Sequence, residues 1–314
     1  MENFKKSKII ILLGPTASGK TELGIKLAQR FNGEVVSADS RQVYTKMNIG
    51  TAKPFGEWQL VGGSKVYVVK GIPHYLMDII DPKEQMSVAQ FKELAVGCLY
   101  AIQARGKLPI VVGGTGQYLW ALIDNLIIPA VAPSQALRAS LEQKSLAELQ
   151  QLLQHCDPES YQAIDRHNPR RVLRALEVAM ITGKSFIEQR RVGAPLFNTL
   201  QIGIHWPWEK LLARINRRVE EQIAQGLDEE TKRLVQEQYG WDLPSMSSIG
   251  YQQMGSYVRG ECTKAEAVRA IQVATRQYAK RQITWFKRDK RINWIEGDDI
   301  VTAVGLIEKF LQEK

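Results

Sequence analysis

The residues Gly14-Pro15-Thr16-Ala17-Ser18-Gly19-Lys20-Thr21 decide the fold of this chain. An apolar run typical of a buried strand, 9–13, precedes them, and a helical pattern over 22–31 follows. Strand, Gly-x-x-x-x-Gly-Lys-Thr and helix in this order form a phosphate loop, in which backbone N–H groups and the positive end of the helix bind an anion. We expect Lys20 to reach outer phosphate oxygens and the Thr21 hydroxyl to ligate Mg²⁺. The loop alone does not say which phosphate group it holds.

Length and composition indicate a folded protein of about two domains. The chain has 314 residues, of which 44% are hydrophobic, which is enough for a sizeable core. The apolar run 9–13 is far too short to span a membrane, so we expect a cytoplasmic protein with no membrane partner. The three cysteines, Cys98, Cys156 and Cys262, are scattered without disulfide or zinc spacing, and Cys98 falls on the apolar face of a predicted helix.

The net charge of +9 is concentrated in one stretch of the chain. Residues 264–291 hold nine basic side chains and two acidic ones, a local excess of +7. Thr263 and Glu266 form a capping-box pattern that predicts a helix from this point, with one basic face made of Arg269, Arg276, Lys280 and Lys287. A nucleic acid is the first candidate partner, and a merely solvated helix face is the alternative. The interleaved aromatic residues could stack on bases or pack in the core; they are Tyr278, Trp285 and Phe286.

Two further strands are predicted to end beside the phosphate loop. The strand 34–37 leads into Asp39, and the strand 108–112 leads into the Gly-rich turn 113–116. Ligands bind at the carboxyl ends of the strands in a parallel sheet, so both segments are candidate walls of the site. Asp39 could be a Mg²⁺ partner, a general base or only a helix N-cap, and Thr115 offers a hydroxyl.

The order of the patterns predicts an α/β fold, with a phosphate-loop parallel sheet flanked by helices, an inserted helical subdomain and a helical C-terminal region. We divide the chain into a first part of the core, 1–117, a helical insert without strands, 118–198, and a segment that completes the core, 199–314. Further strands are predicted at 66–69, 74–79 and 200–204, and helices at 87–105, 137–156, 168–182, 208–225 and 247–257.

Six motifs in a fixed order resemble the tRNA dimethylallyltransferases. Besides the phosphate loop, they lie at 39–44 (Asp-Ser-Arg-Gln-Val-Tyr), 48–54, 112–118, 249–251 and 275–285. The resemblance covers roughly residues 9–295. This family comprises the isopentenyl-transferases that modify adenosine 37 beside the anticodon of tRNA.

The resemblance implies that a dimethylallyl group passes from dimethylallyl diphosphate to N6 of that adenosine, with release of diphosphate and with Mg²⁺ as cofactor. The loop from Gly14 to Thr21 would then hold the leaving group, with Mg²⁺ on Thr21. Asp39 matches the general base that takes a proton from the adenine amine. Four further residues match catalytic positions: Lys20, Thr115, Arg171 and Arg218. A phosphate-loop kinase of a small metabolite or nucleotide is the alternative, and a nucleic-acid-binding module without chemistry is a third.

The resemblance also implies contacts to the anticodon stem-loop of tRNA. The matching positions are Asp39, Ser40, Arg41, Gln42, Thr115, Arg138, Arg170, Arg171, Arg174, Ser247, Ser248, Ile249, Gly250, Tyr251, Gln252, Lys280, Arg281, Gln282, Ile283, Thr284, Trp285, Phe286 and Lys287. The target base would have to flip out of the loop to reach a buried centre. We expect a monomer whose helical insert and basic helix hold the RNA by its backbone.

Overall fold

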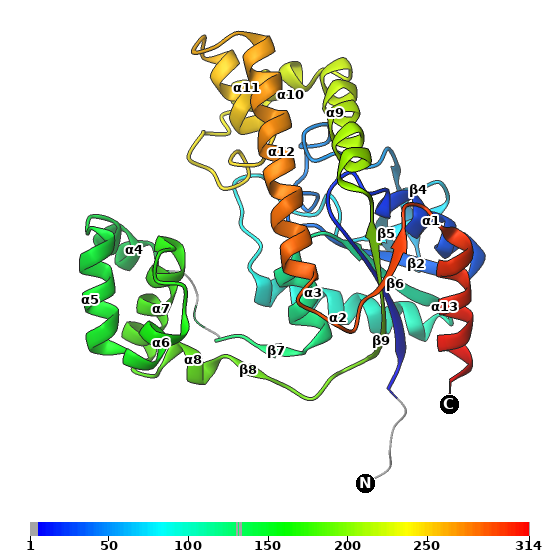
Figure 1. The fold of residues 1–314 in the computed structure, drawn as a ribbon, viewed down its shortest axis with the longest axis horizontal. Coiled ribbons are helices and arrows are strands. Elements are labelled where there is room, and N and C mark those ends of the chain that lie inside the picture. The colour runs from blue at the N-terminus through cyan, green and yellow to red at the C-terminus, as the bar shows by residue number, and fades with distance from the viewer. Residues whose placement is uncertain (1–5, 130, 132–133, 314) are drawn as a thin grey trace. The chain divides into compact units, whose positions relative to one another are not determined.

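A central eight-stranded sheet organises the chain (Figure 1). The computed structural model describes residues 6–129, 131 and 134–313. Residues 1–5, 130, 132–133 and 314 lie outside the description. The strand order is β10-β9-β1-β6-β2-β5-β4-β3. The strands from β10 to β5 run parallel, whereas β4 and β3 run antiparallel at one edge. The predicted α/β fold with a largely parallel sheet is confirmed.

The strands are β1 (Lys8–Leu13), β2 (Gly33–Ala38), β3 (Glu57–Val61), β4 (Ser64–Val69), β5 (Ile72–Tyr75), β6 (Leu108–Gly113), β7 (Leu126–Ile127), β8 (Arg191–Val192), β9 (Asn198–His205) and β10 (Asn293–Glu296). The helices are α1 (Lys20–Arg30), α2 (Val88–Ala104), α3 (Gly116–Ile123), α4 (Gln135–Glu142), α5 (Leu146–Cys156), α6 (Pro158–Ala163), α7 (Pro169–Thr182), α8 (Phe186–Gln189), α9 (Trp208–Ala224), α10 (Leu227–Gln236), α11 (Tyr251–Val258), α12 (Lys264–Phe286) and α13 (Ile300–Gln312).

Most of the predicted strands exist with small changes at their ends, and one prediction was too long. The strand predicted at 74–79 ends as β5 at Tyr75. Leu76 and Asp78 have positive φ angles of 60° and 59°, which no strand can accommodate. Strands β3 and β10 were missed. β3 is an exposed edge strand without a buried face, and β10 has only four residues, so neither carries a strong periodic signal.

Two apolar clusters hold the core around the sheet. The first joins alternate residues of β1 and β6, such as Ile10 and Ile110, to Leu27 of α1 and Phe310 of α13. The second joins the segment after β2 to α9, α10, α11 and α12, with Tyr251 and Met254 completely buried. Helices α9 and α12 lie side by side in Figure 1 and pack on one another. The second cluster therefore fixes these helices beside the segment that carries Asp39.

The described chain divides into two compact units, residues 1–122 with 196–314 and residues 123–195. The smaller unit has its own apolar core, which includes Leu149, Leu153 and Val172. Asn168 caps α7 through its Oδ1 atom, with Pro169 in the first turn, as the sequence predicts. The prediction of an insert without strands was wrong, because β7 and β8 pair antiparallel. The helix predicted at 137–156 is two helices, since Ser145 caps a new helix, α5.

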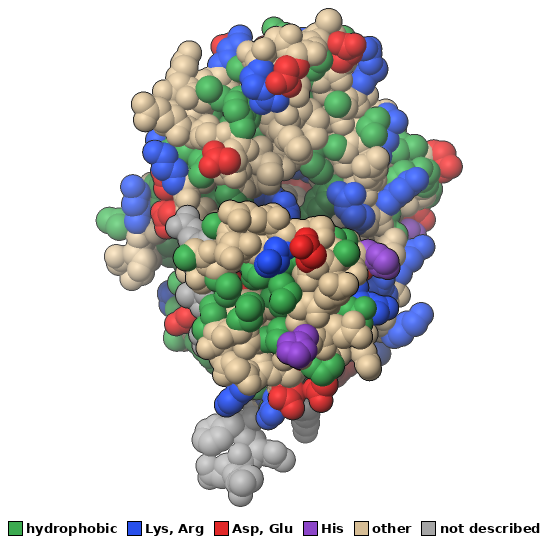
Figure 2. Space-filling view, turned by 90° about the vertical axis from the view of Figure 1, so that its left-hand side faces the viewer, with side chains coloured by type: hydrophobic (Ala, Val, Ile, Leu, Met, Phe, Trp, Pro, Cys, Tyr) green, Lys and Arg blue, Asp and Glu red, His purple; other side chains and the backbone are tan. Residues whose placement is uncertain are grey.

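One face of the molecule carries charges of both signs. Figure 2 shows Lys and Arg side chains distributed among Asp and Glu side chains on the face that it displays. Within the part of the chain that the structure describes, no helix is both long and apolar enough to cross a membrane. The three cysteines are free thiols, and burial raises the pKa of Cys98 to about 11. Cys98 is therefore protonated at neutral pH and unreactive.

Candidate active site

The phosphate loop joins β1 to α1 in a conformation that needs its small residues. Gly14 has a φ of 151°, and a Cβ there would lie 2.8 Å from the carbonyl oxygen of Ile204. Gly19, just before the helix, has a φ of 95°, which favours glycine. Ala17 also has a positive φ, 61°, without being glycine. The loop is therefore held in shape by contacts from the rest of the chain as well as by local preference.

Two side chains from the segment after β9 hold the outer side of the phosphate loop. Trp206 donates its Nε1 hydrogen to the carbonyl oxygen of Ser18 at 3.0 Å, and Arg214 donates from Nε to that of Ala17 at 2.8 Å. The Arg214 guanidinium lies over the Trp206 ring, 4.7 Å from its centre. These bonds satisfy the carbonyl oxygens of Ala17 and Ser18. Sequence reasoning missed both residues, because nothing local links them to the loop.

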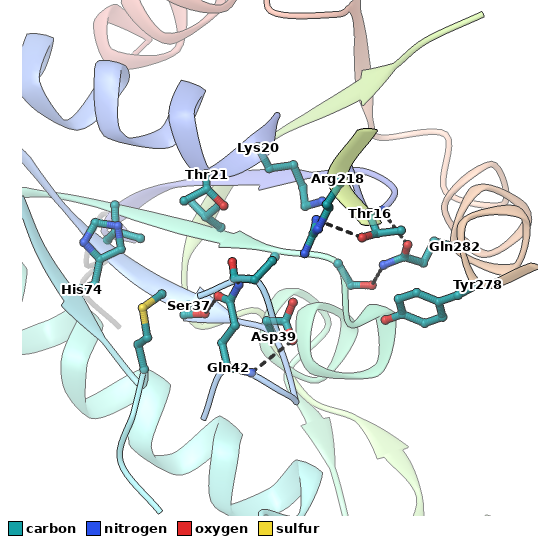
Figure 3. Close-up of a pocket in the computed structure, with 16 residues that line it drawn as sticks. Thr16, Lys20, Thr21, Ser37, Asp39, Gln42, His74, Arg218, Tyr278 and Gln282 are labelled. Carbon is teal, nitrogen blue, oxygen red and sulfur yellow. Dashed lines mark hydrogen bonds between the residues drawn. The ribbon is translucent and has the colours of Figure 1, made fainter. Parts of the chain in front are cut away.

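Two desolvated cations face the same cavity (Figure 3). Lys20 retains some surface, but desolvation of its ammonium group, together with the nearby Arg218 charge, lowers its pKa to about 7, although Asp39 acts in the opposite sense. Burial also lowers the pKa of Arg218. Lys20 donates to the carbonyl oxygen of Pro15 at 2.6 Å, and Arg218 donates to the hydroxyl of Thr16 at 3.1 Å. Two like charges in one cavity are typical of an anion-binding site.

Asp39 lies directly after β2 and faces the cations across the cavity. Its Oδ1 atom accepts hydrogen bonds from the backbone N–H groups of Arg41 at 2.9 Å and Gln42 at 3.4 Å. No helix follows, so the helix N-cap interpretation was wrong and Asp39 instead stabilises a turn. Among the described residues the Oδ2 atom has no hydrogen-bond partner. One carboxylate oxygen is therefore held in place while the other is available to a ligand.

The Gly-rich turn after β6 forms the opposite wall. Thr115 accepts a hydrogen bond from the backbone N–H of Ser40 at 3.0 Å and donates to the Ser40 hydroxyl at 3.3 Å. The Thr115 N–H donates to the carbonyl oxygen of Ala38 at 3.2 Å. These bonds connect the turn to the segment of Asp39. Thr115 thus holds Ser40 with its side chain and Ala38 with its backbone N–H.

Two hollows share four lining residues, Thr16, Asp39, Arg218 and Tyr278. The first hollow holds about 620 Å³, including its open mouth, and extends past Lys20 and Thr21 to the apolar side chains of Val35, Met77 and Val112. The second is lined by Ser247, Ser248, Ile249, Gln252 and Gln253, by residues of α12 that include Gln277, Tyr278 and Arg281, and by Arg41. Burial raises the pKa of Tyr278 to about 12, so its hydroxyl stays protonated. The carboxylate stands where the two hollows meet.

The buried carboxylate of Glu230 connects two of the sequence motifs, those at 48–54 and 249–251. Glu230 accepts hydrogen bonds from the N–H groups of Asn48, Ile49 and Gly50 at 2.9–3.1 Å and from the Tyr251 hydroxyl at 2.6 Å. A Cβ at Gly50 would lie 2.4 Å from the Tyr251 ring. The motif at 249–251 therefore anchors the motif at 48–54. Tyr251 was predicted to contact tRNA, but its side chain is completely buried and serves as an internal support.

The residues predicted on α12 fall on two faces. Tyr278, Arg281 and Trp285 line hollows beside Asp39 and Thr115. A separate groove, outside these hollows, is lined by Trp206, Trp208, Lys280, Ile283, Thr284, Lys287 and Trp294. The basic residues predicted to share one face do not form one solvated surface, because Arg276 is half-buried and donates to Asn216 of α9 at 2.8 Å. Lys280 and Arg281 are neighbours in sequence but serve different surfaces.

Four predicted RNA contacts are internal side chains in this structure. Phe286 is 1% exposed and packs in the core. Of the two interpretations of the aromatic residues, core packing and base stacking, the first therefore holds for Phe286. Gln42 donates to the carbonyl oxygens of Thr51 and Ala52, and Ser248 donates to that of Ser245. Gln282 is also buried, with its amide bonded to backbone on both sides. These side chains are held by contacts within the protein and also line the hollows, so each helps to shape the site, and their contact with RNA stays a prediction.

The smaller unit contains the four other predicted arginines. Arg138 and Arg174 pair with the fully buried Glu177 at 2.9 Å and 2.6 Å. Although burial raises the pKa of Glu177, hydrogen bonds from Arg138 and Arg174 lower it overall. These two arginines neutralise a buried carboxylate, which is a structural role. Arg170 and Arg171 are exposed, and Arg171 lies 3.6 Å from Asp165.

The oxygen donors present fit a Mg²⁺ ion that is held mainly by a substrate. Among the described residues, no three His, Cys, Asp or Glu side chains gather as a metal site. Thr21 and Asp39 both line the first hollow. Mg²⁺ commonly binds one or two protein oxygens together with phosphate oxygens and water. A hydroxyl and a carboxylate beside a phosphate loop meet that requirement.

A phosphate loop on a parallel sheet, with a carboxylate across the cavity, defines the class of phosphate-loop proteins suited to group transfer. The model of one family, described as IPP transferase, matches residues 42–289, and the chain belongs to this family. The match begins after the phosphate loop, so it is independent of that motif.

Known relatives support the same assignment. The chain is 45% identical to the tRNA dimethylallyltransferase of Roseiflexus sp. (strain RS-1), over 92% of this chain and 93% of that protein. It is 42% identical to that of Acetivibrio thermocellus, over 93% and 92%. The crystal structure of the tRNA isopentenylpyrophosphate transferase from Bacillus halodurans is similar with a TM-score of 0.69 and 36% identity, covering 98% of this chain and 96% of that one.

A eukaryotic dimethylallyltransferase acting on tRNA has a TM-score of 0.76 at 26% identity and covers 97% of this chain and 77% of its own. The names of all these proteins describe prenyl transfer. The alternative of a small-metabolite kinase gains no support from them.

Proposed function

We propose that this protein transfers a dimethylallyl group from dimethylallyl diphosphate to N6 of adenosine 37 in tRNA and releases diphosphate. The family relationship supports prenyl transfer to tRNA. The observation that carries the proposal is the position of Asp39 between two hollows, one at the phosphate loop and one lined by polar side chains of residues 247–253 and of α12. The hollow at the phosphate loop suits the diphosphate donor, and the hollow lined by Ser247, Gln252 and α12 suits the extruded adenine.

In the reaction, the N6 atom forms a bond to the first carbon of the dimethylallyl group while that carbon loses its bond to the diphosphate oxygen. The proton of N6 passes to the Asp39 carboxylate. An exocyclic adenine amine is a weak nucleophile, because its lone pair is delocalised into the ring. Removal of the proton as the new bond forms therefore lowers the activation barrier. General base catalysis of this kind typically raises the rate by a factor of about 10² to 10⁴. Because Oδ1 is held by backbone N–H groups, Oδ2 is the atom suited to accept it.

The departing diphosphate gains negative charge, and Lys20, Arg218 and the loop N–H groups would stabilise that charge. The side chains of Lys20 and Arg218 are already shielded from water, so their electrostatic interaction with the diphosphate charge is strong. A Mg²⁺ ion on Thr21, when bound with the diphosphate, would supply further charge neutralisation. The apolar end of the first hollow, near Val35 and Val112, suits the dimethylallyl group.

On the acceptor side, we assign RNA contact to the exposed polar residues of the second hollow, Ser247, Gln252 and Arg281, together with the half-buried Arg41. Exposed residues of the smaller unit, Arg170 and Arg171, are candidates for further backbone contacts to the anticodon stem. Both sets offer hydrogen-bond donors suited to phosphate and to base edges.

The test is to incubate the protein with Mg²⁺ and unmodified tRNA, in one series with prenyl-labelled dimethylallyl diphosphate and in another with γ-labelled ATP. We expect prenyl label in tRNA, located in N6-dimethylallyladenosine after nucleoside digestion, and no transfer of the γ-phosphate. A control tRNA with guanosine at position 37 should remain unlabelled. Transfer of phosphate without prenyl transfer would refute the proposal.

A further inference from the structure

Gln282 of α12 connects three parts of the site. Its side chain is 7% exposed, and its Oε1 atom accepts a hydrogen bond from the N–H of Thr16 at 2.7 Å. Its Nε2 atom donates to the carbonyl oxygen of Gly114 at 2.8 Å. The amide thus bridges the phosphate loop and the Gly-rich turn, as the dashed lines in Figure 3 mark. In this position the Thr16 N–H is bonded within the protein.

The close contact between α12 and the Gly-rich turn requires glycine at two positions of the turn, Gly114 and Gly116. A Cβ at Gly114 would lie 2.4 Å from Gln282 Nε2, and a Cβ at Gly116 would lie 2.1 Å from Trp285 Nε1. The turn can therefore approach the helix only because these residues are glycines. Such close packing allows little independent movement of helix and turn.

The same part of α12 faces the second hollow. Tyr278 and Arg281 line it, and they lie one turn and one residue before Gln282. On the other side of the bridge, Thr16 accepts the hydrogen bond from Arg218 at 3.1 Å. A shift of α12 would thus move Thr16 and, with it, one of the two cations of the first hollow.

We propose that Gln282 is a positioning residue that couples RNA binding along α12 to the affinity of the phosphate loop for diphosphate. This inference rests on the proposed function for the identity of the RNA. RNA that contacts Tyr278 and Arg281 fixes α12, and the Gln282 amide then fixes Thr16 and Arg218 in the geometry that binds diphosphate. By linkage, diphosphate must tighten RNA binding by the same factor.

The test uses the whole protein and inorganic diphosphate with Mg²⁺ as the probe. Calorimetry gives its Kd with and without an unmodified anticodon stem-loop RNA, for the wild type, Gln282→Met and Gln282→Glu. Met keeps the length of the side chain without hydrogen bonds, and Glu keeps only the acceptor. Val273→Ala, at an exposed position of the same helix, is the control.

We expect RNA to tighten diphosphate binding in the wild type and in Val273→Ala. In Gln282→Met, diphosphate should bind about tenfold more weakly, because α12 no longer holds the phosphate loop, and the effect of RNA should largely disappear. RNA affinity without diphosphate should change less than threefold. An unchanged Kd and an unchanged effect of RNA in Gln282→Met would overturn the proposal, as would a wild type without coupling.

A second measurement does not depend on the folding of a variant. RNA alone should slow hydrogen exchange of residues 14–21 in the wild type, and unchanged exchange there would also count against the proposal. Because these experiments follow binding and not transfer, failure of the coupling is distinguishable from failure of prenyl transfer.

Discussion

At the scale of single residues, Asp39 combines two roles on its two oxygens. Oδ1 holds the turn at 41–42, and Oδ2 is available to the substrate. Asp39→Asn keeps an Oδ1 acceptor for the turn but removes the proton acceptor. Asp39→Ala removes both, so it mixes a structural effect with the chemical one.

We therefore expect Asp39→Asn to lower kcat by a factor of about 10² to 10⁴, with stem-loop RNA affinity within a few-fold of the wild type. Single-turnover transfer and RNA binding, measured on the same preparation, check this prediction. If Asp39→Asn retained more than about a tenth of the wild-type rate, Asp39 would not be the base.

Lys20 gives a second prediction at this scale, concerning pH. Its pKa is about 7 in the folded protein and 10.5 ordinarily, so the unfolded chain binds the additional proton between these values. Stability rises with pH where the unfolded state binds more protons, so the cost of burying this cation is full below pH 7 and fades towards pH 10.5. Lys20→Met should be more stable than the wild type at pH 6.5, and the difference should shrink by pH 10.

Urea denaturation of both proteins at a series of pH values measures this difference. The same variant should lose most of the stabilisation that added diphosphate gives to the wild type. A stability difference that is independent of pH would show that Lys20 keeps its ordinary pKa.

At the scale of the elements, α12 divides a run of basic residues between two surfaces. Arg281 lines the hollow beside Asp39, whereas Lys280 lies over the Trp208 ring, 5.1 Å from its centre, in a separate groove. Each phosphate contact contributes about one unit to the slope of log affinity against log salt concentration, or less for single strands. Substituting Arg281 and Lys280 one at a time therefore tests which of the two surfaces binds RNA.

We expect Arg281→Ala to weaken stem-loop binding and to reduce that slope by roughly one, whereas Lys280→Ala changes it little. Binding measured between low and moderate salt concentrations tests the pair. The reverse order of effects would place the RNA on the Trp208 side of the helix.

At the scale of the whole molecule, the two units have separate cores. The residues proposed to bind diphosphate all lie in the larger unit, while α5 and α7 contribute to the core of the smaller one. A ligand slows hydrogen exchange in the unit whose folded state it stabilises.

Diphosphate with Mg²⁺ should therefore protect residues 14–21 and the first turns of α9, and leave the core amides of α5 and α7 unchanged. Hydrogen exchange followed by mass spectrometry checks this peptide by peptide. Lys20→Met provides the control, because diphosphate should protect neither unit in that variant. Equal protection of α5 and α7 in the wild type would mean that the units respond as one.

The fold and the chemical groups were largely predictable from short-range patterns. The loop before Lys20, the strand before Asp39 and the N-cap at Asn168 each depend on residues within a few positions of one another. The excess of basic residues over 264–291 was equally visible in the sequence. Which of these side chains face the solvent and which pack against other helices was not. Helical spacing could not show that Arg276 bonds α9 or that Phe286 is core, because those facts depend on a partner helix.

The amino-acid sequence by itself determined the phosphate loop, its strand and helix, and the carboxylate that follows the next strand, because backbone preference and apolar periodicity act locally. Only the tertiary structure decided what surrounds them. Thr16 and Gln282 are 266 positions apart, and Ser18 and Trp206 are 188 apart. Hydrogen bonds over such separations form only once the sheet and helices have packed. The loop is thus specified locally, and its geometry is held by side chains that the fold brings to it.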